Sequence, residues 1–441
     1  MAARRSGLRR EVGLFQLVTY GVGNIIGAGI YVLVGGAAGL AGGAVWLAFL
    51  IAAGIALFTG LSYSELASMY PKAASEYVYV GKAYGNRMLS FLAEWIMLIT
   101  EVVAAAAVAL GFAGYFQSLF VFPVPILAAF LLIALTIVVI IGIKESIGLN
   151  TVLSLIAVLG LVVVIIAGVT KIGSVHVNYV APPFGISGVF GAIILVFFAY
   201  IGFDNISNLS EETKNPQKTI PRGLLISLAI STVFYIAVSL AAVNLVPWQQ
   251  LAGSSAPLAL AVSKAFGANA YFALTVAGLV TTLNTTLVLL IVGSRIIYGM
   301  ASEGALPRFL GRVGRRGTPY VASVAALLVS LAFVSLGNVD SVARITSFGS
   351  LIVFAMVNIS LLHLRRAVPR MKRPFKAPFN VGWISVTALL GVVSCLALLT
   401  QFGLESVLLG LAFPLSGFAA YFLINRNLDM EVDSGLHQKH E

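Results

Sequence analysis

Three acidic residues lie inside strongly apolar segments of this 441-residue chain. Glu94 and Glu101 are in the segment 89–117, and Asp204 is in the segment 187–208. No Lys or Arg lies deep in any apolar segment. Because a charge at the centre of a bilayer costs at least ~2.5 kcal/mol, each acid is a candidate functional residue. A buried acid without a basic partner is either protonated or paired with a cationic cargo, a proton or Na⁺ from outside the chain.

The depth of each acid predicts a different role. Glu101 lies about 18 Å into its helix, close to the bilayer midplane. Glu94 lies one heptad earlier, and we predict an interfacial carboxylate that faces water. Asp204 is either a gate or proton-titrating group, or it caps a helix that begins there. A polar row in 271–294 could bind a hard cation, although interhelical hydrogen bonds are favoured; it comprises Thr281, Thr282, Asn284, Thr285 and Thr286.

Glycine is concentrated at two matched places in the apolar segments. Gly21, Gly23, Gly27 and Gly29 fall within nine residues, and their spacing differs from a dinucleotide-binding loop. They form either a face for close helix packing or a break in the helix, whose freed amides would meet an anionic group. Gly202 interrupts 187–208 in the same way. Two interrupted segments at equivalent positions favour discontinuous helices around a transport site.

The composition assigns these residues to a helical membrane protein. The chain is 59% hydrophobic and 10% charged, with a mean hydropathy of +1.01, which excludes an ordinary cytosolic enzyme or a disordered chain. Runs of about 20 apolar residues cross a bilayer. We predict an all-α protein with twelve spans, at 13–36, 42–64, 89–117, 124–142, 150–170, 187–208, 223–246, 271–294, 319–336, 344–364, 382–402 and 406–425.

The basic residues predict the orientation. With the N-terminus in the cytoplasm, all 27 Lys and Arg lie on inside segments except Lys171, Lys264 and Arg344. The predicted tails 1–12 and 426–441 are therefore cytoplasmic, and the first apolar segment is a retained span. The net charge of +11 reflects topology, so we exclude nucleic acid as a partner. The single cysteine, Cys395, allows no intrachain disulfide and no thiolate metal cluster.

Six further motifs follow one another along the chain: GNIIGAGIY at 23–31, SELASMYPKAASEYVY at 64–79, FFAYIGFDNISNLSEETKNPQKTIP at 197–221, SRIIYGMASEGALP at 294–307, GTP at 317–319 and LRRAVPRMKRPFKAP at 364–378. Together and in this order they resemble the amino acid–polyamine–organocation transporter superfamily, in its amino-acid permease branch. The resemblance implies a leucine-transporter-like fold of two inverted five-helix repeats, 13–170 and 187–364, followed by two further helices within 382–425.

The resemblance also implies a substrate site at the broken helices. The substrate carboxylate would bind amides around Ile26, Gly27, Ala28 and Gly29. The substrate ammonium would bind carbonyls near Gly23, Asn24 and Ile25 and near Phe198, Ala199 and Ile201, beside the Gly202 break. Phe198 stands where the family has an aromatic gate, and the cargo side chain would be read by Glu101, Phe198 and polar groups such as Asn284.

Two departures from the family pattern affect coupling and cargo. Many proton-coupled members carry a lysine where this chain has Ala157. The sequence therefore leaves Na⁺ coupling, exchange and facilitated transport open as alternatives to the usual proton coupling. Members that carry cationic amino acids have an acid where this chain has Thr100, with Glu101 one residue later. One residue is about 100° around a helix, so the motif leaves open whether Glu101 faces the cargo.

The sequence thus predicts a secondary-active transporter of an amino acid in the plasma membrane, with cationic amino acids among the candidate cargoes. We expect no catalytic residues, no bound metal and no cofactor besides H⁺ or Na⁺ as the coupling ion. The nearest alternative is a carrier of polyamines or other organic amines, which would not need the carboxylate contact at Gly27–Gly29. The cargo, the stoichiometry and the oligomeric state are left open by the sequence.

Overall fold

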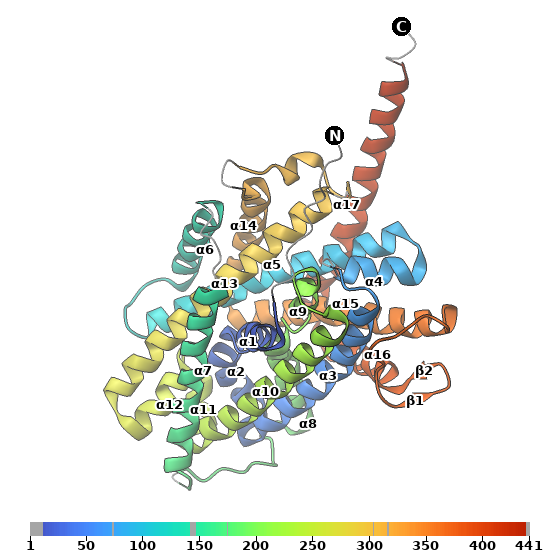
Figure 1. Cartoon of the computed structure of the whole chain (residues 1–441). Helices are drawn as coiled ribbons and strands as arrows, with labels where there is room; N and C mark the ends of the chain where they lie inside the picture. Colours follow the sequence, from blue (N-terminus) through green and yellow to red (C-terminus); the bar gives the residue numbers. More distant parts are fainter. Residues whose placement is uncertain are drawn as a thin grey trace.

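Helices form almost all of the described chain in the computed structural model (Figure 1). The structure describes residues 12–72, 75–141, 147–173, 175–302, 304–314 and 317–437, and at 147–151 and 425–437 it describes the backbone alone. The predicted N-terminal tail therefore lies almost entirely outside the described residues. The predicted C-terminal tail begins as a continuation of the last helix.

Each predicted apolar segment coincides with a helix or a pair of helices. The elements are α1 Leu14–Ile25, α2 Ala28–Ala41, η1 Gly42–Ala44, α3 Val45–Met69, α4 Ser75–Tyr84, α5 Arg87–Gln117, α6 Val124–Ile141, α7 Ile147–Thr170, α8 Gly185–Phe197, η2 Phe198–Tyr200, α9 Asn205–Asn208, η3 Leu209–Glu211, α10 Pro216–Leu245, α11 Trp248–Ala252, α12 Pro257–Phe266, α13 Ala268–Ser302, η4 Arg308–Gly311, α14 Tyr320–Val334, α15 Val339–Ala367, β1 Asn380–Val381, β2 Ile384–Ser385, α16 Val386–Leu399 and α17 Leu404–His437.

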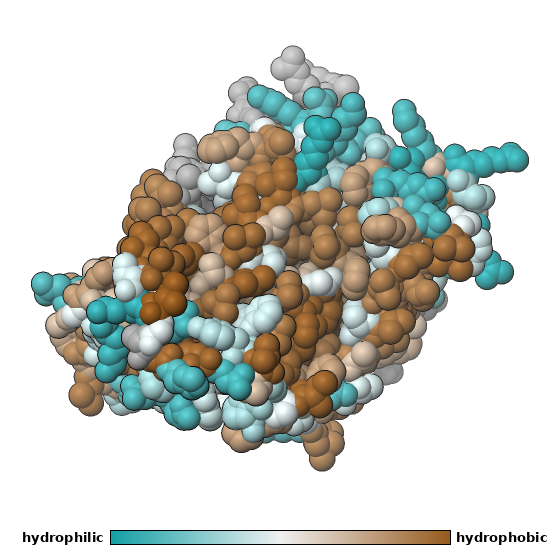
Figure 2. Space-filling view, turned by 90° about the horizontal axis from the view of Figure 1, so that it is seen from below, coloured by the Kyte–Doolittle hydropathy of each residue, from teal (hydrophilic) through white to brown (hydrophobic). Residues whose placement is uncertain are grey.

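Nine helical regions of the described chain are long and apolar enough to cross a membrane. The first, Leu14–Met69, contains the first two predicted spans, and the ninth and eleventh predicted spans are the shorter helices α14 and α16. Figure 2 shows a broad hydrophobic area between hydrophilic patches at the lower left and the upper right. An all-α polytopic membrane protein is therefore confirmed, and the count of twelve spans stays a prediction.

Three short helices occupy connections that the apolar pattern does not predict. α4 follows the second predicted span, whereas α11 and α12 lie between the seventh and the eighth. In Figure 1, α4 and the antiparallel β1–β2 hairpin lie to the right, and α11 and α12 lie at the lower left. The two groups of connections therefore lie on opposite sides of the helical body.

Both helices that the glycine pattern predicts to be discontinuous are broken. α1 and α2 are separated at Ile26 and Gly27, and α8 passes through η2 and a non-helical segment before α9. α1 packs against α10 and α7, whereas α2 packs against α8. The breaks thus come together inside the molecule, while the two inverted repeats themselves stay a prediction.

The start of α1 is tied to the chain just after the second break. The Val12 amide donates to the Glu212 carbonyl at 3.0 Å, and the Lys214 amide donates to the Val12 carbonyl at 2.9 Å. This single parallel bridge joins the segment before α1 to the segment between η3 and α10. The outer ends of the two interrupted helices are therefore linked through their backbones.

A buried ionic cluster fastens the segment after α15 to the end of α3. Glu65 is fully buried, and its carboxylate pairs with Arg365 and with Arg373, whose Nε lies 3.2 Å from Oε1. The Ala377 amide also donates to Glu65 at 2.8 Å. Two cations and a backbone donor compensate one carboxylate, as burial of a charge requires.

Candidate functional site: a cavity between two broken helices

The break between α1 and α2 is shaped by glycine at points of close approach. A Cβ added at Gly27 would lie 2.7 Å from the Thr285 hydroxyl oxygen, and one added at Gly29 would lie 2.5 Å from the Ala199 Cα. No real side chain fits at such distances without displacing its neighbours. Glycine therefore lets α13 and the second broken helix reach the backbone of the first.

The second break depends on a backbone conformation that only glycine adopts readily. Gly202 has φ +111°, and a Cβ there would approach the Asn24 carbonyl oxygen to 3.3 Å. The Gly202 amide donates to the Asp204 carboxyl at 3.0 Å. Asp204 precedes α9, but its side chain makes no capping hydrogen bond to that helix. Of the two interpretations of Asp204, helix capping is therefore wrong.

One side chain connects both breaks. The buried hydroxyl of Tyr235, on α10, donates to the Ala199 carbonyl at 2.8 Å and also lies within hydrogen-bond distance of the Ile25 carbonyl. The Tyr235 ring packs against Phe49 and Tyr200. The backbone on either side of the cavity is thus held by a third, continuous helix.

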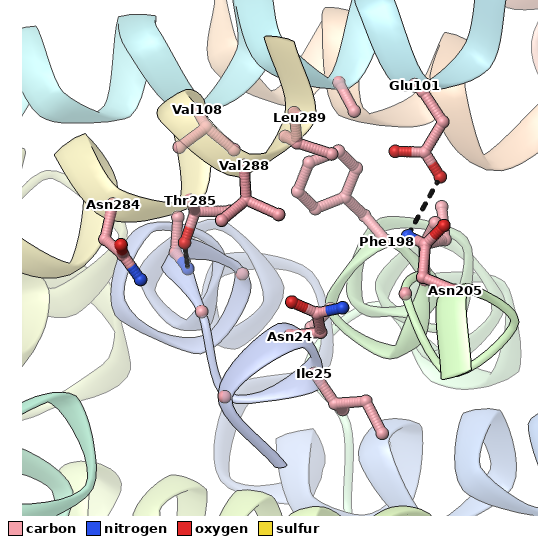
Figure 3. A pocket seen from close by; sticks show the side chains of 18 residues that line it. Asn24, Ile25, Glu101, Val108, Phe198, Asn205, Asn284, Thr285, Val288 and Leu289 are labelled. Atoms are coloured by element: carbon pink, nitrogen blue, oxygen red, sulfur yellow. Dashed lines mark hydrogen bonds between the residues drawn. The ribbon is translucent and has the colours of Figure 1, made fainter. Parts of the chain in front are cut away.

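A central cavity opens where the two breaks meet α5 and α13 (Figure 3). It encloses about 560 Å³ of space, part of it open to solvent. Its lining comes from the first break, from α5, from the second break and from α13, and comprises Gly23, Asn24, Ile25, Gly27, Ala28, Gly29, Glu101, Ala104, Val108, Phe198, Ala199, Ile201, Gly202, Asn205, Asn284, Thr285, Val288 and Leu289.

The first break gives the cavity a helix N-terminus. α2 begins at Ala28, whose amide donates to the Thr285 hydroxyl at 3.2 Å. An exposed helix N-terminus carries a partial positive charge and unpaired amides, so it suits a carboxylate. The hydroxyl of Thr285 also donates to the Thr281 carbonyl one turn earlier in α13. The polar row on α13 therefore contributes directly to the cavity wall.

Glu101 supplies the carboxyl group of the cavity. Its side chain is 1% exposed, and Asn205 donates to Oε1 at 3.4 Å, as Figure 3 shows. Oε2 is buried without a hydrogen-bond partner among the described residues. On the same face of α5, Ala104 and Val108 continue an apolar wall. The cavity thus combines one carboxyl with small aliphatic side chains.

The structure shows which of the neighbouring residues Thr100 and Glu101 faces the cavity. Glu101 faces the cavity, whereas the Thr100 hydroxyl donates to the Ile96 carbonyl and the side chain points at Gly349 of α15. Thr100 and Ile26 do not line the cavity, although both are predicted substrate contacts. Every other predicted substrate contact lies in the cavity wall, and their binding roles stay predictions.

The place of the family lysine lies outside the cavity wall. The Ala157 carbonyl on α7 accepts a hydrogen bond from the Tyr31 hydroxyl at 2.6 Å. One turn earlier, the buried Ser154 hydroxyl has no partner among the described residues, and a Cβ added at Gly23 would lie 2.3 Å from it. Hydroxyl groups therefore occupy the space between α7 and the first broken helix.

The prediction for Glu94 is wrong. The side chain does not face water: it is 3% exposed, and its Oε2 accepts a hydrogen bond from the Tyr77 amide of α4 at 3.1 Å. The apolar pattern missed this contact because it does not predict α4, which packs over this turn of α5. Glu94 therefore joins α4 to α5 instead of marking a membrane surface.

Sequence reasoning also missed several cavity residues. Asn205 directly follows Asp204, close to the break at Gly202. A second polar residue beside a break in an apolar helix could have been predicted from the sequence to line the site. The apolar residues Ala104, Val108, Val288 and Leu289 carry no such signal, because aliphatic side chains occur throughout the spans. Only the packing of α5 and α13 decides which of them face inward.

The chain matches known transporters over nearly its whole length. Residues 12–425 match the amino acid permease family. It is 33% identical to the branched-chain amino acid permease BcaP of Bacillus subtilis, over 95% of this chain and 94% of that protein. It is 31% identical to a methylthioribose transporter of the same organism, over 86% of each chain. It is also 31% identical to the vacuolar cationic amino acid transporter 4 of Arabidopsis thaliana, over 82% of this chain and 64% of that protein. The chain therefore belongs to the amino acid permease family.

Proposed function

We propose that this permease is a secondary-active transporter that moves an amino acid across the plasma membrane by alternating access. The observation that carries the proposal is the cavity between the two broken helices, with the α2 N-terminus on one side and Glu101 on the other. An amino acid needs a partner for a carboxylate and partners for an ammonium. Backbone amides of the α2 N-terminus suit the first, where the carboxylate would replace the Thr285 hydroxyl as the acceptor at Ala28, and backbone carbonyls of the breaks suit the second.

The cavity wall supports a cargo with an aliphatic or a cationic side chain. Val108, Val288 and Leu289 form an apolar surface, and Glu101 adds one acid. Relatives are named as carriers of branched-chain and of cationic amino acids. We propose that Glu101 meets the positive end of a cationic cargo, whereas a neutral cargo uses the apolar surface.

Alternating access requires that the two broken helices move relative to α5 and α13. Phe198, which is mostly buried at the cavity, is the proposed gate between cargo and one side of the membrane. The basic residues support a cytoplasmic location for α4, for the segment that carries Arg370 and Arg373, and for both termini. H⁺ and Na⁺ are the candidate coupling ions.

A pair of glycine variants tests the site. We expect Gly27→Leu to abolish binding and uptake, because its side chain would fill the carboxylate side of the cavity. Gly54→Leu is the control, since a Cβ at Gly54 meets no atom within 4 Å. Uptake of labelled leucine and arginine into proteoliposomes measures transport, and ligand-dependent shifts of the melting temperature measure binding. Normal uptake by Gly27→Leu would remove the broken-helix site.

A carrier of organic amines is the second candidate. The Ala28 amide is already bonded to Thr285, and an amine has no carboxylate that would need this donor. Competition between an amino acid and its decarboxylated amine separates the two functions. An amino-acid transporter discriminates strongly against the amine, whereas an amine carrier binds it at least as tightly.

A further inference from the structure

A further buried carboxyl lies on α4, outside the apolar segments. Glu76 is 2% exposed, and it accepts hydrogen bonds from the Tyr63 hydroxyl at 2.7 Å and from the Ser75 hydroxyl at 2.8 Å. Both donors are neutral, and no ion pair to Glu76 is found among the described residues. Burial raises the pKa of Glu76 above its ordinary value. The group is therefore placed to hold a proton.

A chain of polar side chains connects Glu76 to the cavity. The backbone amide and the hydroxyl of Ser75 both donate to the side-chain oxygen Oδ1 of Asn208, at 3.3 and 3.1 Å. Asn208 donates to Asn205 at 3.5 Å, and Asn205 donates to Glu101 at 3.4 Å. The Ser75 hydroxyl has one proton, which it can donate either to Glu76 or to Asn208. The protonation of Glu76 therefore affects the hydrogen bond between Ser75 and Asn208.

The charged and titratable groups around Glu76 are acidic or phenolic. They come from α3, from α5, from the segment before α9 and from α4 itself: Tyr63, Glu94, Glu101, Asp204 and Tyr79. α15 also packs on α4, but its His363 contacts Tyr84 at the far end and its Arg365 is paired with Glu65. The carboxyl groups are close enough to repel one another when ionised.

Two carboxyl oxygens in this group have no hydrogen-bond partner in the described part of the chain. They are Oε2 of Glu101 and Oδ2 of Asp204, and both are fully buried. Several ionised carboxylates cannot share a buried region without positive charge, because desolvation and mutual repulsion both oppose it. A cationic group that enters the cavity beside Glu101 therefore changes how many protons the neighbouring acids hold.

We propose that Glu76 is a proton-binding site of the transport cycle, linked to the cargo cavity through Ser75, Asn208, Asn205 and Glu101. The Glu76 carboxylate takes up a proton from water on one side of the membrane and releases it to water on the other side after the cavity has changed the side to which it opens, so one proton crosses with the cargo and no other group is consumed. This inference rests on the proposed transport function. It assigns proton coupling to α4 in a chain that has Ala157 at the place of the family lysine.

Proteoliposome transport at controlled pH tests the inference. For the wild type we expect a pH gradient to drive accumulation of labelled leucine or arginine, and a trapped pH-sensitive dye to report accompanying proton movement. We expect Glu76→Gln to reduce the gradient-driven component at least tenfold, while one-for-one exchange, which moves no net proton, continues. Asn208→Leu should reduce the same component, because it interrupts the chain and keeps the side-chain volume.

Glu94→Gln is the matched control. It replaces a buried carboxyl next to α4, and its amide oxygen can still accept the hydrogen bond from Tyr77. Glu94 has no link in the hydrogen-bonded chain from Ser75 to Glu101, so we expect the maximal response of this variant to the gradient to stay within twofold of the wild type. The loss of one nearby acid should shift only the pH at which Glu76 binds its proton. The inference is overturned if Glu76→Gln keeps the full response, if Glu94→Gln alone loses it, or if wild-type uptake ignores pH. If Glu76→Gln does not fold, an unchanged response in Asn208→Leu overturns it. Failure of the wild type to exchange any amino acid or amine would instead contradict the proposed function.

Discussion

Glu65 and Glu76 are two buried acids only eleven residues apart, yet their surroundings are opposite. Glu65, near the end of α3, has Arg365, Arg373 and a backbone amide around its carboxylate. Glu76, on α4, accepts from two hydroxyl groups and from its own backbone amide, no cation is paired with it in the described part of the chain, and further acids lie nearby. The first is an ion-paired carboxylate that joins two segments, whereas the second can change its protonation.

The difference shows that burial alone does not identify a functional acid. Both side chains are almost inaccessible to solvent. Loss of the Glu65 carboxylate would leave the buried cations around it unpaired, which is strongly destabilising. An uncompensated carboxyl responds to protons and to any cation that approaches, so the partners of an acid separate the two roles.

The largest expected effect is a loss of stability when Glu65, the ion-paired acid, is replaced. Glu65→Gln leaves Arg365, which is 3% exposed, without its charged partner. We expect a loss of about 3–5 kcal/mol in the free energy of unfolding, measured as a lower melting temperature and a smaller folded fraction after detergent extraction. The double variant Glu65→Gln with Arg365→Gln should recover part of the loss. A loss below about 1 kcal/mol would mean that the cluster is not compensated as described.

The next effect is on cargo selectivity. Glu101→Gln removes the ionisable carboxyl of the cavity but keeps an oxygen for Asn205. We expect about a tenfold weaker apparent affinity for arginine, equivalent to about 1.4 kcal/mol, with little change for leucine. Thr100→Val is the control, because that side chain points at α15. Equal losses for both cargoes would assign Glu101 to coupling or structure instead of cargo recognition.

A smaller effect is expected in the pH dependence of stability. The raised pKa of Glu76 means that the folded state favours the protonated carboxyl. Its contribution is complete below the ordinary value of 4.5 and is lost as the pH rises through the raised pKa. Glu76→Gln should remove this dependence. Melting curves between pH 4.5 and 8 measure it, and wild-type and variant curves that stay parallel would contradict the assignment.

The smallest effect is expected for an exposed pair. Lys72 and Glu211 are 3.5 Å apart, and their side chains are 66% and 36% exposed. Exposed ion pairs contribute about 0–1 kcal/mol and are screened by salt. Lys72→Ala should therefore shift the melting temperature hardly at all, and added salt should not change the comparison with the wild type. A large destabilisation would contradict this prediction and would show that the exposure of an acid does not identify its role any better than burial does.

Much of the helical framework could be predicted from the sequence. Apolar runs located the helices because bilayer thickness sets their length. The glycines predicted both breaks because backbone contact and a positive φ at Gly202 demand a residue without Cβ. α4 escaped prediction because ten residues with Glu76 and Lys82 show no apolar run.

The sequence predicted which helices form the site, but it did not predict which face of each helix lines the cavity. The motifs left open whether Thr100 or Glu101 faces the cargo, since one residue is about 100° of rotation. The packing of α5 between α13 and α15 decides it, and those contacts join residues far apart in the chain. Glu76 was missed because it lies between the apolar segments in which buried acids were sought.

Tyr235 offers the two breaks a single hydrogen-bond donor that they share. Its hydroxyl has one proton, but the carbonyls of Ile25 and Ala199 both lie within its reach. One break can hold that proton only while the other does without it. In the proposed cycle, the ammonium of a cargo brings three more N–H donors to the cavity and ends this competition. Cargo recognition and the mutual adjustment of the two broken helices would then be one hydrogen-bonding event.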